Sequence, residues 1–388
     1  MKTKAPFPGQ VDRRSVVGGL AATLPFALAG RAESAQVMRA GPRFDPEALR
    51  LLLRTEAERA GTRAVICGVW SGSSEILVEA LGTSTQGVPA TPDMHYRIGG
   101  ITETFMVTLL FMLADERRID LDAKISLWFP TLLAADQVTP RMLAANTAGY
   151  LDYVKDKAWL KRLLANPFAP FSDVELIHYA VRGGRMNYAP PGSGWAYSHT
   201  EYVILGQVIQ RATGQSIQSL YERYLLGPLR LRDTRLPPDA AIQRPALHAY
   251  MLDRGGYEDS TNWTPSWAYS YGGLTSSVRD LGQWGRIFGN GRLLSRRSFR
   301  EMISPGAARL KANPPPVYFA HGFVVANGWY VQNPDFNGYA GAFAYNPARD
   351  LTIVIVSTKN ERPIIDPAAI HILKTMVAKI TPESPVNF

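Results

Sequence analysis

Strand-like segments occur at both ends of the 388-residue chain, whereas its middle is helical in pattern. Residues 63–70 and 75–82 are two apolar runs, and the stretch Ser71-Gly72-Ser73-Ser74 between them has the composition of a tight turn. Strand patterns return near the other end, at residues 322–331, 340–345 and 351–357. We therefore predict an α+β fold in which the two chain ends build one antiparallel sheet flanked by helices.

The segment between the terminal strands predicts a helical insertion. Phe105, Leu109, Met112 and Leu113 recur at helical spacing within residues 102–118, which predicts a buried amphipathic helix. Further helices are predicted at residues 173–182, 202–213, 217–224, 277–288 and 367–380. We expect one domain over residues 45–385, with a sheet part at about 45–100 and 265–385, a helical part at about 101–264, and a cleft between them.

The first 35 residues resemble an export signal. A basic start and the pair Arg13-Arg14 precede an uncharged apolar stretch from Val16 to Ala29, as in twin-arginine signals. The apolar stretch is too short to span a bilayer as a permanent helix. We expect cleavage between Ala29 and Gln36, no transmembrane segment afterwards, and a mature protein that is periplasmic or secreted.

Charge and cysteine usage exclude several classes of site. The net charge is +9, but the basic residues are scattered and form no cluster with interleaved aromatics, so we expect no nucleic-acid partner. Cys67 is the only cysteine and lies in an apolar run, which predicts a buried thiol and no intrachain disulfide. Five histidines lack ligand spacing, so we expect no metal and no cofactor: His95, His178, His248, His321 and His371.

Four segments carry motifs in a fixed order. They are residues 96–105 (YRIGGITETF), 143–151 (LAANTAGYL), 191–200 (PGSGWAYSHT) and 272–281 (GGLTSSVRDL). Together they resemble the serine β-lactamase-related family of class C β-lactamases, D,D-peptidases and family VIII esterases, over roughly residues 50–380. The resemblance implies the β-lactamase/D,D-peptidase fold, a sheet flanked by helices with a helical insertion domain.

The chain departs from this family at the positions that carry its chemistry. The family's Ser-x-x-Lys motif places a nucleophilic serine one helical turn before an activating lysine, and these positions are Gly100 and Glu103 here. Glycine offers no nucleophile, so no acyl-enzyme can form at this position. The Tyr-x-Asn motif reads Tyr197-Ser198-His199, and counting back from Tyr345 places Gln332-Asn333-Pro334 at the third motif.

The replacements are themselves capable of proton transfer. If the family geometry holds, Glu103, Tyr197 and His199 converge on one cleft, and a carboxyl, a phenol and an imidazole are common acid-base groups. We predict an acid-base enzyme acting on a neutral or aromatic small molecule, as a lyase, isomerase, cyclase or water-activating hydrolase. In this hypothesis His199 is the base, Tyr197 the proton donor or oxyanion partner, and Glu103 orients or recharges the histidine.

Other residues of the same segments are candidates for substrate binding. Gly100, Asn146 and Gln332 are the candidates for ligand contact, although for Asn146 the favoured role is to cap or bond a turn beside the cleft. An aromatic pocket in the helical part is a further hypothesis, with the candidate residues Trp195, Trp263, Trp267, Tyr269 and Tyr271.

Two alternatives stay open at this point. The first is a catalytically inactive periplasmic binding or scaffold protein that retains only the cleft. The second is a serine hydrolase with a relocated nucleophile, such as Ser198 or Ser276. Ser198 and His199 do not form a dyad, because neighbouring residues on an extended segment point to opposite faces.

Overall fold

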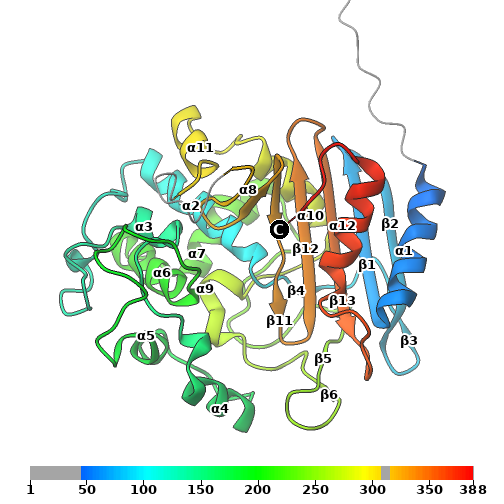
Figure 1. Ribbon diagram of the computed structural model, residues 1–388, viewed down its shortest axis with the longest axis horizontal. Coiled ribbons are helices and arrows are strands. Elements are labelled where there is room, and N and C mark those ends of the chain that lie inside the picture. Colours follow the sequence, from blue (N-terminus) through cyan, green and yellow to red (C-terminus); the bar gives the residue numbers. More distant parts are fainter. Residues whose placement is uncertain (1–44, 307–314, 388) are drawn as a thin grey trace, which may run out of the picture. The chain divides into compact units, whose positions relative to one another are not determined.

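A nine-stranded antiparallel sheet joins the two ends of the chain, as the strand patterns predict (Figure 1). The computed structural model describes residues 45–306 and 315–387, and the predicted export signal lies outside these ranges. In sheet order the strands are β3 (Val88–Pro89), β2 (Ser74–Thr85), β1 (Thr62–Ser71), β13 (Leu351–Lys359), β12 (Tyr339–Asn346), β10 (Trp329–Gln332), β9 (Val324–Ala326) and β8 (Val317–Phe319), with β11 (Asp335–Phe336) paired to β12.

Both faces of the sheet are covered, which explains why its central strands are apolar throughout. On β13, Ile353 and Ile355 face a cluster formed with α1 (Pro46–Ala60) and α12 (Ala368–Ile380). Val354 and Val356 point the other way, toward a larger cluster that includes α10 (Val278–Gly289). Figure 1 shows α1 and α12 side by side on one face. The predicted buried thiol of Cys67 lies in the first cluster and is fully buried.

The remaining elements form the helical part and its connections. The helices are α2 (Ile101–Asp115), α3 (Pro140–Ala144), α4 (Lys157–Ala165), α5 (Asp173–Val181), α6 (His199–Thr213), α7 (Ile217–Tyr221), α8 (Gly227–Leu229), α9 (Tyr269–Gly272) and α11 (Arg296–Met302), with a π-helical turn at Glu222–Leu226 and 3₁₀ turns at Ile125–Leu127, Tyr153–Lys155 and Ser266–Ala268. Two short ladders pair β4 (Tyr96–Arg97) with β7 (Thr275–Ser276) and β5 (Tyr250–Met251) with β6 (Glu258–Asp259).

Two predictions about these elements need correction. Helix α2 is not amphipathic, because it contacts α6, α9 and α11 and is buried on nearly every side. The single strand predicted at residues 322–331 is two strands, β9 and β10, since Asn327 and Gly328 both adopt positive φ and form a tight turn. Among the described residues, no helix is both long enough and apolar enough to cross a membrane.

Candidate active site

A cavity of about 420 Å³ lies where the start of α2 meets the segment before α6 and the strands β9 to β11. Its polar lining residues come from four separate parts of the chain, and its walls are largely aromatic. The lining residues are Gly100, Glu103, Trp195, Tyr197, His199, Trp267, Ala268, Tyr271, Gly272, Phe319, Val324, Gln332, Asn333, Pro334, Asp335 and Phe336. The cleft predicted from the motif order is therefore present.

Gly100 and Glu103 lie at the N-terminal end of α2, one helical turn apart. Gly100 presents only backbone to the cavity, and a Cβ atom at this position would lie 3.1 Å from Gln332 Oε1 and 3.6 Å from Glu103 Oε1. The serine position of the family thus faces the cavity without a nucleophilic side chain.

The Glu103 carboxyl is buried, with 1% of the residue exposed. The Tyr197 hydroxyl donates to Glu103 Oε1 at 2.5 Å, and Gln332 Nε2 donates to Oε2 at 3.1 Å. Burial raises the pKa of the Glu103 carboxyl to about 8, because hydrogen bonds from Tyr197, Gln332 and Tyr202 offset only part of the lost hydration. Glu103 therefore retains its proton through most of the neutral range.

His199 is the first residue of α6, and its partner is Asp152 rather than Glu103. Nδ1 of His199 lies 3.1 Å from each carboxylate oxygen of Asp152, which caps the 3₁₀ turn at Tyr153–Lys155. Burial alone would raise the pKa of Asp152, but the hydrogen bond and charge of His199, together with the Val154 backbone N–H and the charge of Lys155, lower that pKa overall. The expectation that Glu103 orients His199 is thus replaced by an Asp152–His199 pair, which the motifs did not reveal.

Tyr197 lies between Glu103 and the Asp152–His199 pair. Its ring meets that of His199 edge to face, with centroids 4.9 Å apart, while its hydroxyl reaches Glu103. Burial, followed by the charge of Glu103, raises the Tyr197 pKa far above its usual value. The phenol consequently stays protonated, and the structure brings the three predicted acid-base groups to one cavity.

Gln332 occupies the position predicted from the third motif. It ends β10 and donates to both Glu103 and the Gly322 carbonyl oxygen, so its amide fills the space beside Gly100. Counting back from Tyr345 without a gap therefore selected a segment, residues 332–334, that lines the cavity.

Asn146 does not line the cavity. It is fully buried with φ of 56°, and its Oδ1 accepts the backbone N–H of Ser198 at 2.5 Å. The ligand contact predicted for Asn146 is therefore wrong, whereas a bonding role beside the cleft agrees with its support of the Tyr197–His199 segment. Ser198 and Ser276 also lie outside the lining, since Ser198 Oγ donates to Leu151 and Ser276 Oγ contacts Thr234, which gives no support to a relocated nucleophile.

The predicted aromatic pocket is present in part. Trp195, Trp267 and Tyr271 line the cavity, whereas Trp263 and Tyr269 do not. Phe319 and Phe336 complete the wall, and Phe336 stacks on Trp267 with centroids 4.5 Å apart. Phe336 could have been identified from the sequence as a wall residue, because it comes just after the third motif. Nothing in the sequence marks Phe319 in this way.

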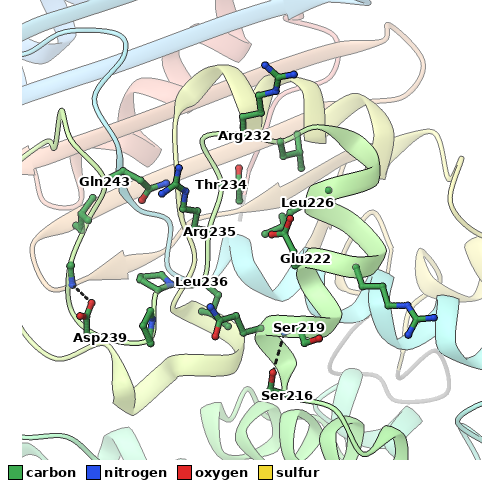
Figure 2. Close-up of a pocket in the computed structure, with 18 of the residues that line it drawn as sticks. Ser216, Ser219, Glu222, Leu226, Arg232, Thr234, Arg235, Leu236, Asp239 and Gln243 are labelled. Atoms are coloured by element: carbon green, nitrogen blue, oxygen red, sulfur yellow. Dashed lines mark hydrogen bonds between the residues drawn. The ribbon is translucent and has the colours of Figure 1, made fainter.

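A larger hollow of about 1200 Å³ lies elsewhere, between the α7 helix and residues 232–243. Figure 2 shows Ser219 and Glu222 on the helical side, facing the loop that carries Arg235 and Leu236. None of the predicted site residues lines this hollow. Within residues 45–306 and 315–387, no three His, Cys, Asp or Glu side chains come together in a way that could hold a metal ion.

Residues 49–375 match the sequence profile of the Beta-lactamase family, and the chain belongs to that family. It is 24% identical over 233 residues to a D-aminopeptidase of Gluconobacter oxydans, covering 56% of this chain and 40% of that protein. It is 25% identical over 244 residues to penicillin-binding protein 4 of Amycolatopsis lactamdurans, covering 61% of each. The matches thus span less than two thirds of the length of these relatives.

Solved structures share the fold over most of the chain. A D-stereospecific amidohydrolase from Streptomyces sp. superposes with a TM-score of 0.74 at 24% identity, covering 87% of this chain and 99% of that one. The octameric penicillin-binding protein homologue from Pyrococcus abyssi gives a TM-score of 0.74 at 18% identity, covering 88% and 79%. The β-lactamase/D,D-peptidase fold, with its sheet flanked by helices, is therefore present.

Proposed function

We propose that this chain is an exported enzyme that performs acid-base chemistry on a small molecule without forming an acyl-enzyme. One observation carries the proposal: two proton-active pairs, Asp152–His199 and Glu103–Tyr197, meet at one cavity beside the bare backbone of Gly100. Relatives named as a D-aminopeptidase and an amidohydrolase support an enzyme acting on small molecules.

His199 is the base in this proposal. Its Nδ1 lies against the Asp152 carboxylate, so in the neutral imidazole the proton is on Nδ1 and the lone pair of Nε2 can accept a proton. The ionised Asp152 then stabilises the imidazolium that forms when Nε2 takes a proton. A quarter of the His199 side chain is exposed, which is enough for contact with a molecule in the cavity.

Tyr197 is the acid, and Glu103 is the positioning residue that recharges it. With Glu103 protonated, its carboxyl donates to the phenol oxygen across the same 2.5 Å contact, which frees the phenol proton for a ligand. Transfer of that proton to substrate is followed by transfer from Glu103 to the phenolate oxygen. Elimination, water addition, isomerisation, cyclisation and hydrolysis by activated water can all use an acid and a base placed in this way.

The first experiment asks whether a covalent step exists. A fluorescent penicillin and a fluorophosphonate probe are incubated with the mature protein, and labelling is read by gel and mass spectrometry. We expect no adduct, since Gly100 has no nucleophile. An adduct at any serine would contradict the proposal and favour the relocated-nucleophile alternative.

The second experiment looks for proton transfer directly. Small esters, amides and carbon acids are incubated in D₂O, with product formation and deuterium incorporation read by mass spectrometry. His199→Ala and Tyr197→Phe should each lower turnover by about 10²- to 10⁴-fold without unfolding the protein. Full activity in both variants would exclude these roles. Thermal stabilisation by a ligand with no product, unchanged in Glu103→Gln, would instead favour a binding protein.

Export is tested separately. Replacing Arg13-Arg14 with two lysines should leave the protein unprocessed in the cytoplasm, whereas the parent chain should be found cleaved in the periplasm or medium. Periplasmic delivery of the double-lysine variant would argue against a twin-arginine signal.

A further inference from the structure

The orientation of the Gln332 side-chain amide is fixed by its two acceptors. Nε2 donates to the Gly322 carbonyl oxygen at 2.5 Å and to Glu103 Oε2 at 3.1 Å. A backbone carbonyl can only accept a hydrogen bond, so the nitrogen of the amide, and not its oxygen, lies on this side. Both protons of the Gln332 amide are thus used within the protein, and its oxygen is left to face elsewhere.

The oxygen of this amide lies beside Gly100, at the cavity. A Cβ atom added to Gly100 would lie 3.1 Å from Gln332 Oε1 and 3.8 Å from Gln332 Cδ, so the oxygen is the part of the amide that approaches the bare backbone. Gly100 and Gln332 both line the cavity. Within the described part of the chain no donor is bonded to Gln332 Oε1, yet this atom is not sealed from solvent. It is therefore an acceptor that a molecule in the cavity can reach.

Donors from the surrounding aromatic wall do not compensate for this acceptor. The indole N–H groups of Trp195 and Trp267 are closed off from solvent, so a ligand does not reach them. The Tyr197 hydroxyl is held by Glu103 and points away from the amide oxygen's own need for a proton. A ligand that covers Gln332 Oε1 without donating to it displaces water and leaves a carbonyl oxygen unpaired, which costs affinity.

We propose that Gln332 is a specificity residue that selects ligands with a hydroxyl or N–H donor at the position beside Gly100. An ether or ester oxygen at this position would meet the lone pairs of the amide oxygen, whereas a hydroxyl or N–H group pairs with them. This inference rests on the proposed function only in taking the cavity as the substrate site. It concerns binding, so it can be measured without turnover.

The test uses two uncharged isomers, 3-phenylpropan-1-ol and 2-phenylethyl methyl ether. Both carry a phenyl ring and an oxygen acceptor, but only the alcohol has a proton to donate. Isothermal titration calorimetry at neutral pH should give the alcohol about five- to tenfold tighter binding, because the ether leaves the Gln332 oxygen without a partner. A crystal structure of the parent chain with the alcohol should place its hydroxyl oxygen about 3 Å from Gln332 Oε1.

Gln332→Met removes the amide oxygen while nearly keeping the length of the side chain. It should abolish most of the alcohol's advantage and leave ether binding within about twofold, which also shows that the cavity remains folded. The control is Asn333→Ala, which removes the neighbouring exposed amide that also lines the cavity; it should preserve the preference for the alcohol. If Gln332→Met does not fold, the crystal structure of the parent chain with the alcohol decides the question.

Four results would overturn the inference: ether binding as tight as that of the alcohol, an alcohol preference that survives Gln332→Met, a bound hydroxyl that does not contact Gln332, or no binding of either isomer at millimolar concentration. A preference for the alcohol without turnover of any substrate would leave the inference standing and count against the proposed function. Turnover of substrates that requires Tyr197 and His199, with no preference for the alcohol, would do the reverse.

Discussion

Two buried glutamates lie close to the same loops, yet their surroundings differ. Glu201, in the first turn of α6, is fully buried and accepts the backbone N–H groups of Ala148, Gly149 and Tyr150 at 3.1, 2.8 and 3.1 Å. Glu103 is equally buried, but its donors are the side chains of Tyr197 and Gln332, and it borders the cavity.

The difference lies in what the donors can do. A backbone N–H cannot give up its proton, so Glu201 can only hold the loop of residues 146–150 in place. A phenol can exchange its proton with a carboxyl, and the cavity gives that exchange a route to a ligand. Burial of a carboxyl is therefore weak evidence for a catalytic role, whereas a partner that can exchange a proton, located beside a cavity, is stronger evidence.

The most direct test of the difference between Glu201 and Glu103 is to remove each carboxyl in turn. Glu201→Ala leaves three buried N–H groups without an acceptor and opens a cavity, so it should lower the free energy of unfolding by about 3 to 5 kcal/mol. Urea denaturation followed by circular dichroism measures this. An equal loss in Glu103→Ala, or a negligible loss in Glu201→Ala, would remove the distinction between anchor and site.

The next effect is a pH dependence carried by Glu103. Its folded pKa of about 8 exceeds the ordinary value of 4.5, so the folded state binds more protons between these values. The contribution of protonated Glu103 to the free energy of unfolding is fully present below pH 4.5 and is lost as the pH rises toward 8. The stability of the parent chain relative to Glu103→Gln, measured across this window by urea denaturation, should therefore fall by a few kcal/mol. A flat difference would mean that Glu103 ionises normally.

The fold was predictable because local patterns and tertiary packing agree. The hairpin of β1 and β2, the strands β12 and β13, and helices α5, α10 and α12 all begin and end close to their predicted residues. Helix α1 was missed, although Asp45 as cap and Pro46 in the first turn are both start signals. The character of α2 could not be read from periodicity, because burial on nearly every side depends on elements far away in the sequence.

The site was predictable only where a motif supplied positions. The order of motifs placed Gly100, Glu103, Tyr197, His199 and Gln332 at one cavity, which the structure bears out as geometry. Asp152 lies 47 residues before His199 and belongs to none of the four motif segments, so no pattern could pair them.

At neutral pH, replacing Glu103 should lower activity without lowering stability, whereas replacing Glu201 should lower stability. Glu103→Gln replaces a buried carboxyl by an isosteric amide that needs no proton uptake to stay neutral, so the variant should be at least as stable as the parent chain. Turnover should still fall by about 10-fold or more, because an amide does not recharge Tyr197. Glu201→Gln is the matched control, and it should lose stability while the fraction that remains folded keeps normal turnover. Comparable stability losses in the two variants would contradict this separation.

The smallest effect is expected next to Glu103, at Gly100. A Cβ atom added there meets only the end of the Gln332 side chain at 3.1 Å and Glu103 Oε1 at 3.6 Å, and both can shift by a few tenths of an ångström. Gly100→Ala should therefore change stability by no more than about 1 kcal/mol, because Gly100 has right-handed helical backbone angles that alanine adopts readily, and neither residue makes a side-chain cap bond. If Gln332 helps to position Glu103, this substitution should lower turnover more than stability, and thermal melts beside rate measurements separate the two. A large loss of stability would instead show that Gly100 is kept for packing, like the loop that Glu201 anchors.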